Sequence, residues 1–351
     1  MKKLLSDFML EEIENIVTEK GFPKFRAKQL YDWVKRGAEW DEISNLPKTF
    51  INDLKDEYEI TALTIIKTLT SKDGTKKFLY ALRDGNVIEG VLMKYSYGKT
   101  LCVSTQVGCR MGCAFCASGI GGLVRNLSAG EILGQIITVN KEEGGGREIT
   151  NVVLMGSGEP LDNYDNVTKF ITLANKELGI SQRNISLSTS GIAHKIIELS
   201  KDFSVTLTIS LHATTDEVRE RLMPVDKKYK LAEVVGAAKT YFENTGRRVV
   251  FEYSMIDKVN DTDDDIERLA TLTRGFPSHV NLIRLNTVKE KGLTGTPVAR
   301  VKEFMDGLIK RNVSVTLRRS MGNDIEGACG QLRRKHMGDG SDKLSDRFSK
   351  Y

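Results

Sequence analysis

The sequence predicts an α/β protein in which parallel strands alternate with helices. From about residue 100 onward, short runs rich in β-branched and apolar residues alternate with runs whose apolar residues recur at helical spacing. We expect strands at 100–105, 151–156, 185–189, 205–211, 249–254, 280–285 and 313–318, with helical stretches in every gap. Repeated strand–helix units favour right-handed crossovers, and therefore a complete barrel, a partial barrel or an open sheet. In each of these folds, ligands bind at the carboxyl ends of the strands.

The clearest helix boundaries lie in the first of these gaps. The segment Ser128-Ala-Gly-Glu131 is a capping-box sequence that directly precedes an apolar helical pattern. The three glycines at 144–146 are a stop signal for the same helix. These signals predict a helix between the capping box and the glycines.

Residues 1–60 predict a small helical accessory domain, because apolar residues recur there at helical spacing. Within 20–36, six basic residues stand against one acidic residue, with four aromatic residues among them: Lys20, Lys24, Arg26, Lys28, Lys35 and Arg36 against Asp32, with Phe22, Phe25, Tyr31 and Trp33. This composition is typical of an RNA-binding surface, and equally of an ordinary solvated basic face. Both interpretations stay open.

A β-rich linker region is expected at 61–99, between the helical domain and the alternating part of the chain. Strands are predicted at 60–68, 77–82 and 87–94, and the last two are joined at Asp84-Gly85, a turn signal. Glu89 lies on the last of these strands. We assign 100–337 to a catalytic domain, and we expect the polar, glycine-containing tail at 338–351 to be flexible.

Composition excludes several classes of protein. The chain has 351 residues, is 40% hydrophobic, and carries a net charge of +5 from 52 basic and 47 acidic residues. No run approaches the roughly 18 apolar residues of a membrane span, and the amino-terminal segment does not continue into the long apolar core of a signal peptide. We therefore expect a cytoplasmic protein that does not contact a membrane.

The five cysteines favour a metal or redox role over a disulfide scaffold. Three of them, Cys109, Cys113 and Cys116, have C-x3-C-x2-C spacing on one short segment after the strand expected at 100–105. A structural zinc site closes with four protein ligands, and an ordinary iron-sulfur cluster also takes four thiolates. Three thiolates around a four-iron cluster leave one iron open, and an open coordination position allows chemistry.

Six sequence blocks carry a resemblance to a known family. They are Gln106-Val-Gly followed by the segment from Cys109 to Cys116, Gly156-Ser-Gly-Glu-Pro160, Ser188-Thr-Ser-Gly191, Ser210-Leu-His-Ala213, Val280-Asn-Leu-Ile-Arg-Leu-Asn286 and Ala328-Cys-Gly-Gln-Leu332. In this order they resemble the RlmN/Cfr adenine methyltransferases of the radical S-adenosylmethionine superfamily. The resemblance implies a partial (β/α)6 barrel with a small helical domain and a short β extension. It also implies a [4Fe-4S] cluster on the three cysteines, and two molecules of S-adenosylmethionine per turnover.

The resemblance further assigns a set of residues at or just past strand ends to S-adenosylmethionine binding: Gly158, Glu159, Ser190, Ser210, Leu211, His212 and Asn286. Taken singly, a serine or asparagine at such a position is usually a turn or cap residue. A carboxylate after a glycine turn can accept a hydrogen bond from the ligand's ammonium group. Only the resemblance to the family assigns these residues to ligand binding.

The remaining two cysteines have paired roles in the resembling family. There, the counterpart of Cys329 receives a methyl group, and the methyl carbon is then linked to adenine while still bound to sulfur. The counterpart of Glu89 removes the ring proton, and the counterpart of Cys102 attacks the Cys329 sulfur to release methylated RNA. From the sequence alone, Cys102 could equally be a small buried apolar residue, and Glu89 a solvent-facing residue on an alternating strand.

The expected substrate is an adenine in RNA, flipped out of its stack. One branch of the resembling family methylates carbon 2 of an adenine in 23S ribosomal RNA and in the anticodon arm of transfer RNA, and we favour this branch. The other branch methylates carbon 8 and gives antibiotic resistance, and Arg284 is a feature associated with it. The basic residues of the carboxyl-terminal region are candidate phosphate contacts: Arg318, Arg319, Arg333, Arg334 and Lys335.

We further expect a monomer that takes electrons from a donor such as flavodoxin or ferredoxin. A different class of protein also fits the cysteines, namely a non-catalytic iron-sulfur or zinc RNA-binding protein that senses redox state.

Overall fold

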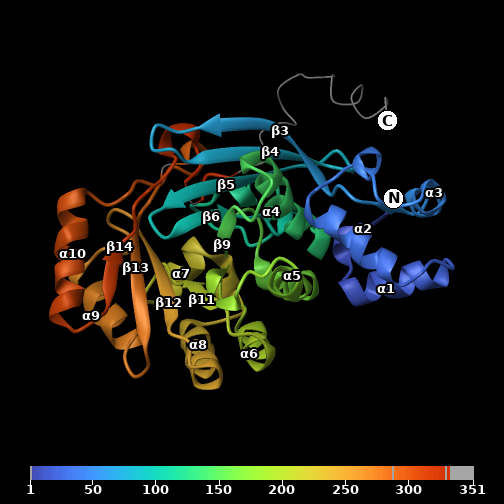
Figure 1. Cartoon of the computed structure of the whole chain (residues 1–351). Helices are drawn as coiled ribbons and strands as arrows, with labels where there is room; N and C mark the ends of the chain where they lie inside the picture. The colour runs from blue at the N-terminus through green and yellow to red at the C-terminus, as the bar shows by residue number, and fades with distance from the viewer. Residues whose placement is uncertain (1, 287, 329, 333–351) are drawn as a thin grey trace.

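A single ten-stranded sheet organises the chain, with helices packed against it and a helical module at the amino terminus (Figure 1). This computed structural model describes residues 2–286, 288–328 and 330–332. Cys329, the basic residues Arg333, Arg334 and Lys335, and the tail expected at 338–351 lie outside the described residues. The predicted α/β class is confirmed.

The strand order in the sheet is β14-β13-β12-β11-β10-β9-β6-β5-β4-β3. The strands of the antiparallel part are β3 (Leu63–Thr70), β4 (Lys76–Leu82) and β5 (Val87–Tyr95). The strands of the parallel part are β6 (Gly98–Cys102), β9 (Ile149–Leu154), β10 (Ile185–Thr189), β11 (Thr206–Ser210), β12 (Val249–Met255), β13 (Ser278–Arg284) and β14 (Val315–Leu317). Within the described residues β3 and β14 are the two edges, so the sheet is open there, as a partial barrel requires.

Helices cover the outer face of the parallel strands. They are α4 (Ala129–Glu143), α5 (Tyr164–Lys176), α6 (Ala193–Asp202), α8 (Leu231–Thr245), α9 (Asp263–Leu272) and α10 (Val298–Lys310), while the short α7 (Asp216–Leu222) packs against the segment from Cys113 to Phe115. Their apolar stripes and the apolar residues of the strands form one continuous core. Leu207 and Ile209 of β11, for example, are fully buried. These two residues alternate with Thr208 and Ser210, so they share the face of the strand that packs against the helices.

The amino-terminal module, residues 2–60, has a hydrophobic cluster of its own. It contains α1 (Leu10–Glu19), α2 (Phe25–Lys35) and α3 (Lys48–Lys55), and its ends meet where β1 (Lys3–Leu4) pairs with β2 (Tyr58–Glu59). The module contacts the start of α4, where the Gly130 amide donates to Asp7 Oδ1 at 2.6 Å. A side chain at Gly130 would lie 2.7 Å from the Asp7 backbone nitrogen, so glycine permits this close approach.

The capping box and the stop signal of α4 are both present. The Glu131 amide donates to Ser128 Oγ, and the Ser128 amide donates to Glu131 Oε2 at 2.9 Å. Gly144 is the first residue after the helix and has a positive φ of 145°. Local sequence therefore defines both ends of this helix.

The strand expected at 100–105 is shorter than predicted, since β6 ends at Cys102. The Ser104 amide donates to Gln135 Oε1 of α4 at 2.9 Å, and the Ser104 hydroxyl donates to the Glu89 carbonyl at 2.7 Å. These contacts draw the chain out of the sheet. It then forms a hairpin that the sequence analysis did not predict, made of β7 (Gln106–Gly108) and β8 (Leu123–Asn126).

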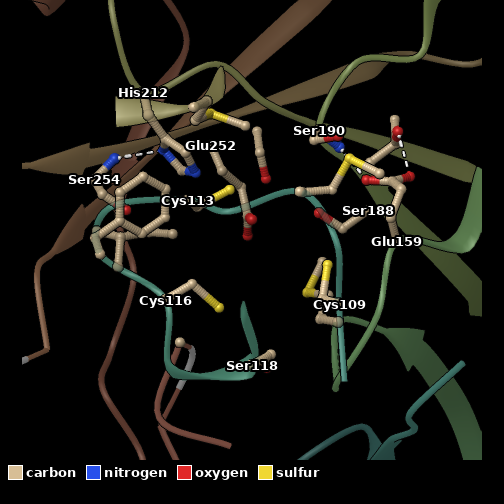
Figure 2. Close-up of a pocket in the computed structure, with 18 of the residues that line it drawn as sticks. Cys109, Cys113, Cys116, Ser118, Glu159, Ser188, Ser190, His212, Glu252 and Ser254 are labelled. Carbon is tan, nitrogen blue, oxygen red and sulfur yellow. Dashed lines mark hydrogen bonds between the residues drawn. The ribbon is translucent and has the colours of Figure 1, made fainter. Parts of the chain in front are cut away.

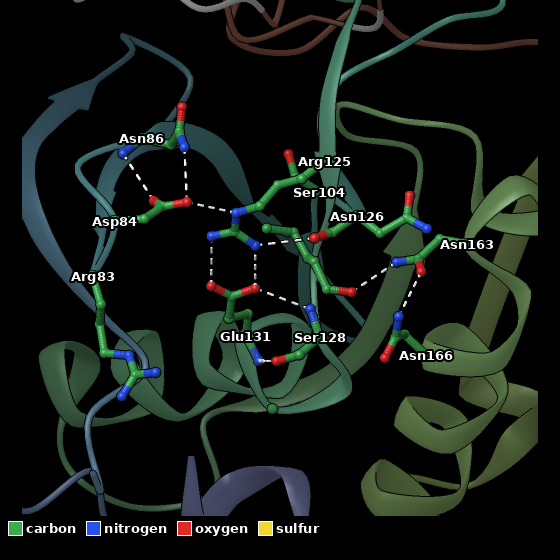
Figure 3. A network of polar contacts seen from close by, with 12 residues as sticks. Arg83, Asp84, Asn86, Ser104, Arg125, Asn126, Ser128, Glu131, Asn163 and Asn166 are labelled. Carbon is green, nitrogen blue, oxygen red and sulfur yellow. Dashed lines mark hydrogen bonds and ion pairs between the residues drawn. The ribbon is translucent and has the colours of Figure 1, made fainter. Parts of the chain in front are cut away.

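Arg125 anchors this hairpin to the rest of the protein (Figure 3). Its guanidinium donates to both carboxylate oxygens of Glu131, at 2.7 and 2.8 Å, and to Asp84 Oδ2 at 2.6 Å. Asp84 lies in the turn between β4 and β5, so one side chain ties together the hairpin, α4 and the antiparallel strands. Bidentate arginine–carboxylate pairs of this kind fix geometry as well as charge.

In the part of the chain that the structure describes, no helix is long and apolar enough to cross a membrane.

Loss of the Arg125 contacts should destabilise the fold in a pH-dependent way. Burial alone would raise the pKa of Asp84, but hydrogen bonds from Arg125 and Asn86 outweigh it and lower this pKa to about 2. A depressed folded-state pKa stabilises the fold fully above about pH 4, and this contribution is lost as the pH falls through about 2. Arg125→Met should lower the free energy of unfolding at neutral pH by about 1–3 kcal/mol, because it leaves the buried Glu131 without its cation.

Urea unfolding followed by tryptophan fluorescence at several pH values tests both statements. The difference in free energy of unfolding between wild type and Asp84→Asn should be constant above about pH 4 and should become smaller below it. The exposed Asp56, changed to Asn, serves as the control. A gap that does not depend on pH would show that Asp84 is not the titrating group.

Candidate active site

A cavity of about 150 Å³ opens at the carboxyl ends of the parallel strands (Figure 2). One wall is the loop between β7 and β8, which carries Cys109, Cys113 and Cys116. The other walls come from residues at or just past the ends of β9 to β13. The cavity therefore lies where the fold class predicts a ligand site, and it brings the three cysteines together with the strand ends.

The backbone holds the cysteine loop at several points. The Cys109 amide donates to the Gly122 carbonyl at 3.1 Å, the Ala114 amide to the Leu222 carbonyl at 2.8 Å, and the Ala117 amide to the Gly330 carbonyl at 2.8 Å. These contacts connect the loop to β8, to the end of α7 and to the carboxyl-terminal segment. The three thiols are consequently presented by a fixed loop.

The thiols require a positive centre in order to ionise. Burial raises the pKa of Cys109 to about 12, and burial likewise raises the pKa of Cys113. Only the thiolate is a strong metal ligand, so a cationic centre must offset this cost. Among the described residues, no group of three or more His, Cys, Asp or Glu side chains is arranged to hold a single metal ion. Three soft ligands around one cavity suit a larger iron-sulfur centre.

Glu159 is a buried carboxylate held in a defined orientation. Its Oε1 accepts from the Leu161 amide at 3.0 Å and from the Thr189 hydroxyl at 2.7 Å, and its Oε2 accepts from the Ser190 amide at 2.7 Å. Burial raises the pKa of Glu159, while the hydrogen bonds oppose this rise. Each carboxylate oxygen has two lone pairs, so these bonds leave an acceptor position on Oε2 for a ligand.

Two features beside Glu159 also indicate a ligand site. Gly158 has a φ of 111°, and a side chain there would lie 2.7 Å from Gln106 Cβ, so only glycine fits. The Ser190 hydroxyl lines the same cavity, is buried beside the Glu159 carboxylate, and forms no well-aligned hydrogen bond in the described structure. A buried polar group without such a bond costs free energy unless a ligand or water satisfies it.

His212 is a neutral wall residue of the cavity. Its backbone has a left-handed φ of 56°, held by Asn260, whose side chain donates to the His212 carbonyl at 2.8 Å. Its Nδ1 accepts from the Ser254 amide at 3.0 Å, which leaves Nε2 as the protonated nitrogen. Burial, together with the charge of Arg219, lowers the pKa of His212 to about 3. Its ring meets the Phe115 ring edge to face, with centroids 4.9 Å apart.

Arg219 supports the strand ends from behind, and the sequence analysis missed it. The side chain is fully buried and pairs with the equally buried Asp226 at 2.9 Å. Its guanidinium donates to the carbonyls of Ser190 at 2.6 Å, Leu211 at 3.2 Å and Ser210 at 3.4 Å. The side chain of Leu211 does not line the cavity, so the structure connects this residue to the site through its backbone. One arginine thus holds three predicted ligand-binding residues in place.

A second cavity adjoins the first. Both are lined by Met155, Ile283 and Asn286, and the second also contains Cys102. Asn286 Oδ1 accepts from the Ser320 hydroxyl at 2.8 Å. The concave face of the sheet therefore continues from the cysteine loop to Cys102.

Glu89 and Cys102 lie on the same face of the sheet. Cys102 pairs with Val91 of β5, and Glu89 is two residues before Val91, so the side chains of all three point to one side. Glu89 is buried, and its Oε1 forms an ion pair with the equally buried Lys77 at 2.9 Å. The ammonium of Lys77 also donates to the Glu326 carbonyl at 3.0 Å. A solvent-facing Glu89, one of the two alternatives, is wrong: the side chain points into the protein.

An ion pair between Arg318 and Glu252, at 2.5 Å, was not predicted from the sequence. Glu252 lines the first cavity and Arg318 lines the second, so the pair lies at their junction. A signal for this was present, since Glu252 and Ser254 alternate with apolar residues on the strand expected at 249–254. Arg318 was expected instead to contact RNA phosphates, and in the structure its guanidinium already pairs with the Glu252 carboxylate.

The segment around Cys329 reaches both cavities. Ala328 lines the second cavity and Gly330 lines the first. The segment is also tied down: the Gly322 amide donates to Asp73 Oδ2 at 3.0 Å, and the Ser118 hydroxyl donates to the Leu332 carbonyl at 2.9 Å.

Comparisons with known proteins agree with this site. Residues 103–272 match the model of the radical SAM superfamily. The chain is 48% identical, over 96% of its length, to a protein of Clostridium perfringens strain 13 that is covered to 98%, and equally identical to one of Alkaliphilus oremlandii that is covered to 99%. Both relatives bear the name probable dual-specificity RNA methyltransferase RlmN.

A solved structure is also closely similar. The crystal structure of a radical SAM methyltransferase from Sphaerobacter thermophilus superposes with a TM-score of 0.91 at 40% identity, and covers 95% of this chain and 100% of that one. The predicted resemblance is thereby confirmed, and the alternative of a non-catalytic RNA-binding protein is not supported. The chain belongs to the RlmN family of radical S-adenosylmethionine RNA methyltransferases.

Proposed function

We propose that this protein methylates carbon 2 of an adenine in 23S ribosomal RNA and in the anticodon arm of transfer RNA, through a methyl group carried by Cys329. The observation that carries the proposal is the placement of the neighbours of Cys329: Ala328 lines the cavity of Cys102, and Gly330 lines the cavity of the three cysteines. The dual-specificity name of the relatives supports two classes of RNA substrate.

The first cavity fits the cofactors that the family implies. Cys109, Cys113 and Cys116 would hold a [4Fe-4S] cluster, and the acceptor position on Glu159 together with the Ser190 hydroxyl would orient S-adenosylmethionine. When bound, one molecule of S-adenosylmethionine would supply the methyl group, and a second, reduced by the cluster, would supply the group that abstracts a hydrogen atom. The electron would come from a donor such as flavodoxin or ferredoxin, and the protein would act as a monomer.

The protein's own residues would direct the transfer. Cys329 would first become S-methylated, because a thiolate is a competent nucleophile. Removal of a hydrogen atom would leave an unpaired electron on its methyl carbon, which would then bond to carbon 2 of adenine. The adduct would give the carbon-2 proton to Glu89 and return one electron to the oxidised cluster. Lys77 stabilises the negative charge of Glu89 that this step requires.

Cys102 would complete the reaction. Its thiolate would attack the Cys329 sulfur and form a disulfide, and the sulfur–carbon bond would break with its electron pair passing to the departing carbon. That carbon would then take a proton and leave as the new methyl group on the RNA. The position of Cys102 on the wall of the second cavity, on the same face as Glu89, supports this role.

Part of the basic surface expected on the amino-terminal module is neutralised within the protein. Lys20 pairs with Glu57 at 2.6 Å, Lys24 with Glu14 at 2.9 Å and Lys35 with Asp32 at 3.0 Å. Such exposed pairs are weak and can open. We propose the module as an auxiliary RNA contact.

The cluster ligands can be tested first. Cys113→Ala should reduce the bound iron and abolish the visible absorption of the reconstituted protein, because two thiolates do not suffice for the centre. Cys102→Ala, reconstituted in parallel, should retain both and serves as the matched control. Normal iron content in Cys113→Ala would contradict the ligand assignment.

The two relay cysteines should give opposite phenotypes. Cys102→Ala should accumulate a covalent protein–RNA adduct, visible as a slower band on a denaturing gel, because the sulfur–carbon bond is no longer broken. Cys329→Ala should give neither adduct nor methylated RNA, and yet still produce 5′-deoxyadenosine from S-adenosylmethionine under reducing, anaerobic conditions. Sustained multiple turnover by either variant would remove that cysteine from the relay.

The position of methylation separates the two branches of the family. Mass spectrometry of nucleosides from ribosomal and transfer RNA, after reaction with this protein, should show 2-methyladenosine in both. The appearance of 8-methyladenosine instead would establish the carbon-8 alternative. Product in ribosomal RNA alone would refute dual specificity for this chain.

A further inference from the structure

Two tyrosines form an exposed stack at the turn between β5 and β6. Tyr95 is the last residue of β5, and Tyr97 directly precedes β6. Their ring centroids are 5.0 Å apart, and the ring planes are nearly parallel at 6°. The Tyr95 hydroxyl contacts Met93 Sδ at 3.4 Å, which fixes the inner ring. Tyr97 is 66% exposed, so the stack covers one face of its ring and leaves the other toward solvent.

This stack lies beside the cavity that contains Cys102. Tyr95 lines the cavity, and Tyr97 packs on Tyr95 without lining it. The same cavity is lined by Arg284, Arg318 and Arg319. Glu252 neutralises Arg318, but Arg284 and Arg319 are exposed and form no ion pair with another residue of the described structure. A flat aromatic surface and two available cations are therefore connected to the wall of the second cavity.

The other large aromatic side chain exposed among the described residues differs in this respect. Phe25 of α2 is 58% exposed, but the guanidinium of Arg26 lies over its ring at 4.8 Å. No lysine or arginine of the described structure lies over Tyr97 in this way. The free ring face is thus a local property of the β5–β6 turn.

We propose that Tyr97 is a stacking platform for an unpaired RNA base next to the target adenosine, with Arg284 and Arg319 contacting the adjoining phosphates. The inference rests on the RNA methylation proposed above, and it names the surface that holds the flanking nucleotide. Tyrosine suits this role because every base has a flat face that can extend an aromatic stack. The positive charges of the two arginines complement the negative charges of RNA phosphates. Flipping the target adenine leaves its neighbour unstacked, and the platform would restore the lost stacking.

The test uses the reconstituted protein and an RNA stem-loop with an unpaired target adenosine. The fluorescent base analogue 2-aminopurine is placed on its 5′ side in one RNA and on its 3′ side in another, since stacking quenches its emission. Wild type should quench one of the two probes. Tyr97→Ala should abolish this quenching and raise the RNA dissociation constant about tenfold, because it removes the stacking energy of one base. Tyr97→Phe should behave like wild type, because the ring is retained.

Salt dependence separates stacking from charge. Tyr97→Ala should leave the slope of log affinity against log salt unchanged, whereas Arg319→Glu should flatten it. Val298→Ala, which removes another exposed apolar side chain, at 63% exposure on α10, should change neither the affinity nor the quenching. Production of 5′-deoxyadenosine without RNA should be the same in all variants, which shows that the cofactor site is intact.

The outcomes distinguish the platform from the proposed function. Unchanged affinity in Tyr97→Ala, equal losses in the alanine and phenylalanine variants, or no quenching of either probe by wild type would overturn the platform. If wild type binds and quenches but forms no methylated adenosine, the proposed function fails and the platform remains. Normal methylation by Tyr97→Ala with unchanged affinity would leave the function and remove the platform.

Discussion

The arrangement of the site depends on the double pairing of β6. This strand runs antiparallel to β5 on one side and parallel to β9 on the other, so the β extension and the parallel sheet share one continuous surface. Hydrogen bonding on both edges fixes the register of β6, and a shift by one residue would turn every side chain to the opposite face. Cys102, its last residue, is thereby held on the concave face beside the strand ends that line the first cavity.

Two fully buried ion pairs maintain this surface at its two ends. Arg219 and Asp226 support the ends of β10 and β11, while Lys77 and Glu89 join β4 to β5. Removing one partner of such a pair typically costs about 3–5 kcal/mol, since the other charge stays buried without compensation. Both pairs also donate hydrogen bonds to backbone carbonyls at the site, from Arg219 to Ser190 and from Lys77 to Glu326. The charges therefore fix the positions of loops more than they add to net stability.

The functional picture combines the cofactor chemistry of the family with the role in RNA binding that we propose for the second cavity. Family membership establishes the first part, and the two adjoining cavities explain how the second can use it: a methyl carrier between them would reach the cofactor on one side and RNA on the other. The exposed Tyr97 ring packs on Tyr95, which lines the second cavity together with Arg284 and Arg319. In our proposal, this surface would hold RNA outside the reaction cavity while a single base is flipped into it.

Sequence by itself determined the elements whose signals are local. The period of apolar residues predicted the strands of the sheet, the capping box and glycines bounded α4, and cysteine spacing predicted the cluster loop. Tertiary structure alone decided the rest. The early end of β6 depends on Gln135, which lies 31 residues from its partner Ser104, and the role of Arg219 depends on three strand ends that meet only in the fold. Burial of Glu89, pairing of Arg318 and adjacency of the two cavities also depend on contacts distant in sequence, which local patterns do not encode.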